Sequence, residues 1–219
     1  GGPEAPEADW DLAWQVNVMA HVRAARELVP GWLERGHGRF LTTVSAAGLL
    51  TMLGSAPYSV TKHAALAFGE WMSATYGDRG ITVQCVCPLG VRTDLLESSG
   101  DTGKAILAGD AITPEEVADA VMAGLADGRF LILPHPQVAD YYAARATDTD
   151  RWLAGMRRLQ AKVFEEERER TTAEDELPGL DLGRLRAYLD GAVPGLGDYD
   201  SLLETCIRSS FLLKNKTIY

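Results

Sequence analysis

The chain has 219 residues, 46% of them hydrophobic and 24% charged, so it can bury a substantial core and is not disordered throughout. Its formal charge of −10, without any basic run, argues against nucleic-acid binding. No apolar stretch approaches the ~20 residues of a membrane span, and the N-terminus shows no basic region followed by an apolar segment. We therefore expect a cytoplasmic protein with neither nucleic acid nor membrane as a partner.

Two helices and a strand are predicted in the first part of the chain. A long helix begins at Asp9, which can cap it, and runs to about Arg35, with Pro30 kinking its last turns. The β-branched and aromatic residues at 39–44 then indicate a strand. A second helix, rich in helix formers, begins near Pro57 and runs to about residue 77.

The second part continues the alternation of strands and helices. Residues 81–87 indicate a buried strand that Pro88 stops. Thr113 and Glu116 have the spacing of a capping box that opens a helix to about residue 126, and residues 130–133 indicate a short third strand. This alternation predicts an α/β fold whose strands pair in parallel.

Tyr58 and Lys62 are the first candidate catalytic residues. They stand four positions apart in the helix that begins near Pro57, so their side chains share one face. An ammonium beside a phenol favours the phenolate, so Lys62 is expected to lower the pKa of Tyr58 and make it an acid/base. Taken alone, such a pair is more often a chance feature of a helix surface.

Ser45 and Asn17 extend this pair. Ser45 follows the strand at 39–44, where its hydroxyl can hydrogen-bond a substrate oxygen. Asn17 lies inside a helical pattern among apolar residues, where an amide is unfavourable unless it has a partner. A bound water linked to Lys62 would supply that partner.

Together with the segment Pro88-Leu-Gly-Val-Arg-Thr93, these four residues resemble the short-chain dehydrogenase/reductase family. The resemblance covers residues 1–135, with a C-terminal helix of the family type continuing to about residue 165. It implies the later strands and helices of a Rossmann-like, doubly wound parallel sheet, and a helical extension. It also implies hydride transfer between an alcohol and a carbonyl, with NAD or NADP as cofactor.

The resemblance assigns a role to each matching residue. It makes Tyr58 the proton donor or acceptor and gives Lys62 contacts to the nicotinamide ribose. Ser45 holds the carbonyl or hydroxyl oxygen, and Asn17 holds a relay water.

The segment after the second strand is implied to contact the nicotinamide end of the cofactor. Pro88, Val91 and Thr93 match the family pattern there, and Val91 and Thr93 would face the carboxamide. Leu89 stands where the family usually has glycine, and Gly90 can relieve the same turn.

A glycine-rich turn between a strand and a helix, which would hold the pyrophosphate, cannot be found. The adenosine and pyrophosphate site is therefore missing, and only the nicotinamide end is represented. We interpret the chain as an N-terminally truncated form that alone neither binds NAD(P) measurably nor turns over. The alternative is a divergent domain that never had such a loop. An exposed parallel sheet edge would favour aggregation.

The remaining residues add little chemistry. The apolar stretch 46–54 fits either a hydrophobic substrate pocket or a buried core loop, and the first reading predicts a hydrophobic alcohol or ketone. Cys85 and Cys87 are interpreted as structural thiols, His21 and His63 as packing or surface residues, and no metal site is predicted.

The composition changes after residue 165. Residues 166–180 form a charged linker, and residues 181–219 form a short helical tail of uncertain order. Residues 180–196 resemble the opening of aminoglycoside-phosphotransferase-like domains.

The resemblance also implies a homo-oligomer in which the helices carrying Asn17 and Tyr58 pack against a second copy. Two alternatives to an enzyme remain open. One is a non-catalytic dimerisation remnant, and the other is a relic of a reductase–phosphotransferase fusion.

Overall fold

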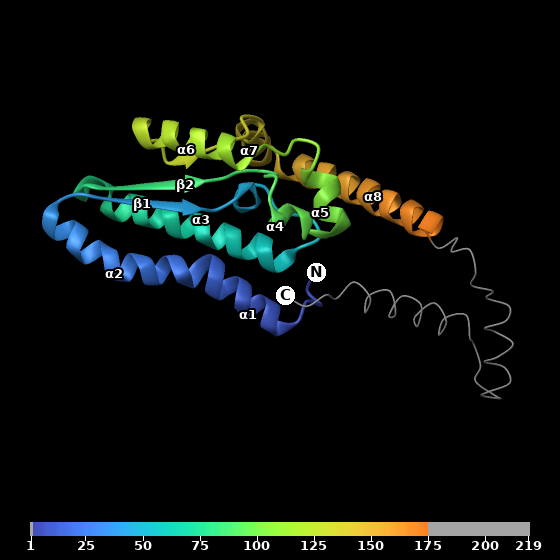
Figure 1. Ribbon diagram of the computed structural model, residues 1–219, viewed down its shortest axis with the longest axis horizontal. Coiled ribbons are helices and arrows are strands. Elements are labelled where there is room, and N and C mark those ends of the chain that lie inside the picture. The colour runs from blue at the N-terminus through green and yellow to red at the C-terminus, as the bar shows by residue number, and fades with distance from the viewer. Residues whose placement is uncertain (1, 175–219) are drawn as a thin grey trace, which may run out of the picture. The chain divides into compact units, whose positions relative to one another are not determined.

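A computed structural model describes residues 2–174 (Figure 1). The predicted tail at 181–219, with its phosphotransferase-like stretch at 180–196, lies outside the described residues, as does the end of the predicted linker. The C-terminal helix α8, Thr149–Glu174, continues nine residues beyond the predicted end at 165.

The described strands form one three-stranded sheet in the order β1-β2-β3. Their pairing is parallel, as predicted. Strand β1 spans Gly38–Thr43, β2 spans Ile81–Val86, and β3 contains only Leu131–Ile132. β3 is thus shorter than the predicted strand at 130–133. In register, Phe40 lies beside Val83 and Cys85 beside Leu131. The parallel pairing brings the carboxyl ends of β1 and β2 to the same edge of the sheet.

Helices cover both faces of this sheet, as Figure 1 shows with α2 and α3 on one side and α6 on the other. Helix α2 spans Ala20–Arg35, α3 spans Ala56–Tyr76 and α6 spans Pro114–Asp127. One core cluster joins α2, α3 and two strands through Ala25, Val29, Trp32, Phe40, Met72, Ile81 and Val83. The capping box of α6 is confirmed, because the Thr113 hydroxyl accepts from the Glu116 N–H at 3.2 Å.

The predicted helix 9–35 differs from the structure in its start and its regularity. It begins as α1, Glu7–Trp14, directly after Pro6, so Asp9 lies in the first turn and is not the cap. A π-helical turn, η1, follows over Gln15–Met19 before α2 begins. Pro30 lies inside α2, which continues to Arg35 and ends at Gly36 with φ of 75°. Acidic residues in a first turn suit the positive end of the helix dipole, which explains Asp9 without a capping role.

Three of the next four helices, α4, α5 and α7, were not predicted as elements. The short helices α4, Asp94–Glu97, and α5, Gly100–Leu107, follow β2. Helix α7, Gln137–Thr147, follows β3, and α8 comes directly after it.

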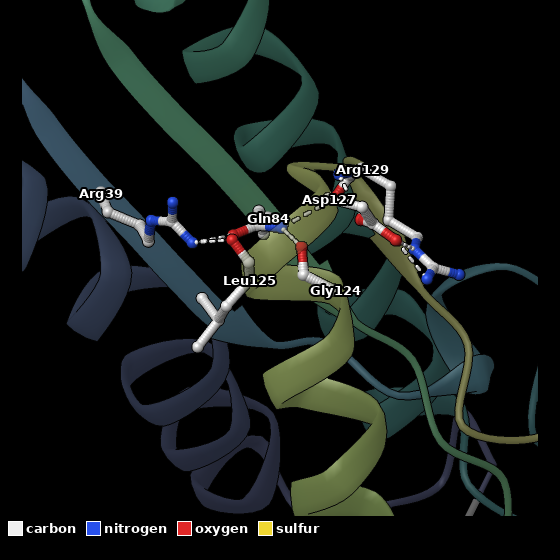
Figure 2. Close-up of polar contacts among 6 residues, drawn as sticks. All are labelled: Arg39, Gln84, Gly124, Leu125, Asp127 and Arg129. Carbon is white, nitrogen blue, oxygen red and sulfur yellow. Dashed lines mark hydrogen bonds and ion pairs between the residues drawn. The ribbon is translucent and has the colours of Figure 1, made fainter.

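A buried polar cluster fastens the end of α6 to the sheet, as Figure 2 shows. Gln84 on β2 is fully buried, and its Nε2 donates to the carbonyls of Gly124 at 2.6 Å and Arg129 at 2.9 Å. Its Oε1 accepts from Arg39 at 3.2 Å, and Arg39 also donates to the Leu125 carbonyl at 2.6 Å. These bonds tie the last turn of α6 and the residues just after it to β1 and β2, and they give the buried Gln84 amide its polar partners.

Candidate active site

Ser45 lies just beyond the carboxyl end of β1 in a strained conformation. Its φ of 83° is unusual for a residue with a side chain. The hydroxyl accepts from the Ala47 N–H at 3.2 Å, and it lies 3.5 Å from the Pro88 carbonyl. The N–H groups of Val44 and Ser45 both donate to the Val86 carbonyl. Ser45 is therefore held between the end of β1 and the segment that follows β2.

Tyr58 and Lys62 share one face of α3, as their spacing predicts. Pro57 lies in the first turn of this helix, where its missing N–H costs nothing. The Lys62 Nζ lies 5.4 Å from the centroid of the Tyr58 ring and donates to the Thr43 carbonyl at 3.1 Å. Lys62 is buried, with 8% of its surface exposed, so this ammonium is withdrawn from solvent.

The predicted lowering of the Tyr58 pKa is wrong for the chain without a cofactor. Burial raises the pKa of Tyr58, while a hydrogen bond with the Ser45 side chain acts in the opposite direction. Burial also lowers the pKa of Lys62, although the nearby Cys87 opposes this. Desolvation of a charged group thus outweighs the attraction that the helical spacing suggested.

Asn17 lies in the π-helical turn η1, a distortion that is frequent at functional sites. Its Nδ2 donates to the Thr61 Oγ1 at 3.0 Å, so the amide has a protein partner beside Lys62 in sequence. Sequence analysis had assigned it only a bound water. One turn further along, the His21 ring lies 2.9 Å from the Thr42 Oγ1, and burial and the charge of Lys62 lower the pKa of His21.

A cavity of about 1030 Å³ adjoins these residues. Five of the predicted residues contribute to its lining: Ser45, Tyr58, Pro88, Val91 and Thr93. Lys62 and Asn17 are not part of the lining. Lys62 contacts the cavity only through Tyr58 and the Thr43 carbonyl, and Asn17 reaches Thr61 on α3.

The rest of the lining is largely apolar. Most residues of the loop 46–54 line the cavity, while Leu49 is fully buried in the core. The use of this cavity by a substrate stays a prediction. Helices α4, α5, α7 and α8 supply the other wall, including Leu95, Ile106, Tyr141, Trp152 and Met156.

The segment at 88–93 is shaped by two residues whose roles the sequence did not reveal. A Cβ on Gly90 would lie 2.2 Å from the Leu107 carbonyl oxygen, so close packing against α5 requires glycine there. The Leu89 N–H donates to Nδ1 of the buried His135 at 3.1 Å. Because Nδ1 accepts this bond, Nε2 carries the proton and donates to the Asp110 carbonyl at 3.2 Å.

The two cysteines of this region fit a structural role. Burial raises the pKa of both Cys85 and Cys87 to about 12, so their thiols stay protonated and unreactive near neutral pH. Within residues 2–174, no group of three or more His, Cys, Asp or Glu side chains could hold a metal ion. In the same range, no helix is both long and apolar enough to cross a membrane.

Comparisons with known proteins agree with the motifs. Residues 2–104 match the model of the family described as short chain dehydrogenase. The 1-deoxy-11-beta-hydroxypentalenate dehydrogenase of Streptomyces exfoliatus is 34% identical over 131 residues, which are 59% of this chain and 47% of that protein. The chain thus spans about half the length of the curated relatives it matches.

Solved structures show the same fold. A short-chain dehydrogenase from Streptomyces avermitilis aligns with a TM-score of 0.58 at 22% identity, over 72% of this chain and 64% of that one. A short-chain dehydrogenase from Sphingobium yanoikuyae in complex with NADPH aligns with a TM-score of 0.54 at 22% identity, over 64% and 54% of the two chains. The α/β fold is therefore confirmed, and residues 2–104 are similar to the short-chain dehydrogenase family.

The two hydrogen bonds of His135 can be separated by substitution. His135→Gln keeps a donor near the Nε2 position but loses the acceptor of the Leu89 N–H, which should cost about 1–3 kcal/mol of unfolding free energy. His135→Asn keeps an acceptor near Nδ1 and gives up only the bond to Asp110, which is exposed to water. Urea unfolding should therefore show the larger loss for His135→Gln, and equal losses would contradict the positioning of Leu89 by His135.

Proposed function

We propose that the whole protein is an NAD(P)-dependent oxidoreductase that interconverts an alcohol and a carbonyl, with Tyr58 as proton donor or acceptor. The observation that carries this proposal is the shared cavity, where Tyr58 and Ser45 lie beside the segment at 88–93 and Lys62 lies behind the tyrosine ring. The dehydrogenases among the relatives support the same reaction class.

In carbonyl reduction, Ser45 and Tyr58 would both approach the substrate oxygen. The Ser45 hydroxyl would hold this oxygen, and Tyr58 would give it a proton. The raised pKa of Tyr58 keeps the phenol protonated, as a proton donor requires. A bound nicotinamide would supply or accept the hydride. In alcohol oxidation, the Lys62 ammonium would stabilise the phenolate of Tyr58 as it takes the proton.

The cofactor fits this chain at its nicotinamide end. Pro88, Val91 and Thr93 line the cavity next to Tyr58, where they would contact the nicotinamide carboxamide. The Sphingobium yanoikuyae neighbour holds NADPH, which supports a nicotinamide cofactor. Within residues 2–174, none of the three strands is followed by a glycine-rich turn into a helix that could hold a pyrophosphate. We therefore assign only the nicotinamide contacts to these residues.

The substrate proposal rests on the wall of the cavity. Its apolar lining favours a hydrophobic alcohol or ketone over a polyhydroxylated one, because polar groups would lose water without gaining partners. The volume of about 1030 Å³ leaves room for a ligand larger than a simple ketone.

The proposed homo-oligomer is supported by exposed apolar side chains on the two long helical segments: Leu12, Trp14, Val16, Leu28, Val60 and Trp71. Such residues are typical of a surface that a partner covers. The non-catalytic interaction remnant and the fusion relic stay predictions.

Tyr58→Phe tests the proposed reaction. In a polypeptide that joins this chain to a glycine-rich cofactor-binding half, the substitution should lower NADPH-dependent turnover on the order of 10²-fold or more, the usual contribution of general acid–base catalysis. Tyr76→Phe is the matched control, because Tyr76 contacts Trp71 and Arg79 and does not line the cavity. Turnover of the Tyr58→Phe protein near the unmutated value would exclude the proton-transfer role.

A second experiment tests which end of the cofactor these residues hold. The 219-residue chain should bind NADPH no more tightly than reduced nicotinamide mononucleotide, because both present the same nicotinamide end to the segment at 88–93. Calorimetric titration of a monodisperse sample with each ligand measures this. Micromolar NADPH binding, at least ~10-fold tighter than the mononucleotide, would show that the chain contains an adenosine or pyrophosphate site.

A further inference from the structure

One wall of the cavity is a strained loop, residues 46–54, which we call the wall segment. Ser45 just before it and Thr51 within it, with φ of 83° and 96°, are the non-glycine residues of the described chain with positive φ. Both line the cavity. Each such conformation costs about 1–3 kcal/mol and persists only where surrounding contacts fix it. Contacts that hold the wall segment are therefore part of the site.

Ser59, which directly follows Tyr58, fixes the strained part of the wall segment. Its buried hydroxyl accepts from the Met52 N–H at 2.9 Å and donates to the Met52 carbonyl at 2.8 Å. Met52 directly follows the strained Thr51, and the Ser59 side chain binds both the N–H and the carbonyl of Met52. This ties the wall segment to the helix that carries Tyr58.

Arg145 on α7 supplies a second attachment. Its Nη1 donates to the Leu49 carbonyl in the wall segment and lies 3.0 Å from Nε2 of His63. The other nitrogen of that ring, Nδ1, lies 2.8 Å from the Ser59 carbonyl. A contact chain thus runs from α7 through the His63 ring to Ser59 and the wall segment.

The chemistry of these partners fixes the state of His63. The Ser59 carbonyl can only accept a hydrogen bond, so Nδ1 must carry a proton. The Arg145 guanidinium can only donate, so Nε2 must offer its lone pair. The contact chain therefore requires a neutral His63.

We propose that Arg145, His63 and Ser59 form a positioning network, the wall latch, that sets the shape of the substrate end of the cavity. The latch holds the wall segment against α3 and joins it to α7, whose Tyr141 and Ala144 line the same cavity. The latch is inferred from contacts alone, whereas the description of the cavity as a substrate pocket rests on the proposed function. The latch residues act on the pocket through the backbone of Leu49 and Met52.

Loss of the acceptor at Nε2 opens the wall latch, because the Arg145 guanidinium then has no partner on this ring. Among the described side chains, the charged group that contacts the His63 ring is Arg145 on α7. Lys62, the neighbour of His63 on α3, directs its ammonium to the Thr43 carbonyl. The wall segment carries no ionisable side chain. Substitutions at Arg145 and His63 should therefore loosen the wall segment selectively.

Amide hydrogen exchange of the full 219-residue chain tests the latch without any substrate or cofactor. Arg145→Met removes the donor and should speed exchange of the Met52 amide on the order of 10-fold or more, a loss of about 1.4 kcal/mol. The amides of β2, such as Cys85, are the internal reference for an intact fold. Arg157→Met is the matched control, an exposed arginine on α8 outside the cavity lining. Equal wall exchange in the two variants overturns the proposal.

His63→Gln supplies the conservative rescue. Its side-chain oxygen can accept from Arg145 near the Nε2 position, whereas His63→Leu offers no acceptor there. We expect the wall segment of His63→Leu to lose protection relative to β2 on the order of 10-fold, and the His63→Gln segment to keep most of it.

This comparison also decides the case in which Arg145→Met loosens β2 as well. Loosening of the wall in His63→Leu but not in His63→Gln supports the latch, whereas equal behaviour of the two variants overturns it. Because the readout is exchange and not turnover, failure of the latch is distinguishable from failure of the proposed reaction.

Discussion

The buried ammonium of Lys62 is the constraint on which the site depends. A charge withdrawn from water is costly unless polar partners surround it, and here the partners are the Thr43 carbonyl at the end of β1 and the face of the Tyr58 ring. Both partners require α3 to lie close to the carboxyl ends of the strands. The position of α3, and not the identity of Tyr58 alone, therefore defines the candidate site.

Two glycines permit this close approach. A Cβ on Gly48 would lie 2.7 Å from the Lys62 carbonyl oxygen, and a Cβ on Gly69 would lie 2.6 Å from the Cys85 sulfur. Since real Cβ atoms do not approach other atoms so closely, a larger residue at either position would push α3 away from the loop or from β2. The burial of the cysteines beside α3, which keeps their thiols protonated, follows from the same packing.

Local patterns predicted the part of the site that is built from nearby sequence. Helical spacing placed Tyr58 and Lys62 on one face, and parallel pairing explains why Ser45 and Pro88 meet at one sheet edge. What the sequence missed depends on contacts across long separations. Arg145 reaches Leu49 over 96 positions, and His135 reaches Leu89 over 46. No local pattern marks these partners.

Two errors have a different origin, because they concern the balance between opposing effects. The π-helical turn around Asn17 interrupts an apolar pattern that fits a regular helix equally well. The pKa of Tyr58 depends on attraction to Lys62 and on desolvation, and spacing alone reports only the first. Burial, which decides the direction of the shift, is set by the whole fold.

The pKa of Tyr58 therefore tests the account most directly. Carbon-13 labelling of the tyrosine ring, with Tyr58→Phe to assign the signal, allows NMR titration of this residue in the 219-residue chain. Because burial raises its pKa, Tyr58 should remain a neutral phenol as the pH rises and ionise only above the ordinary tyrosine value of about 10. Ionisation below that value would contradict the account, since it would mean that Tyr58 is solvated or that the charge of Lys62 outweighs burial.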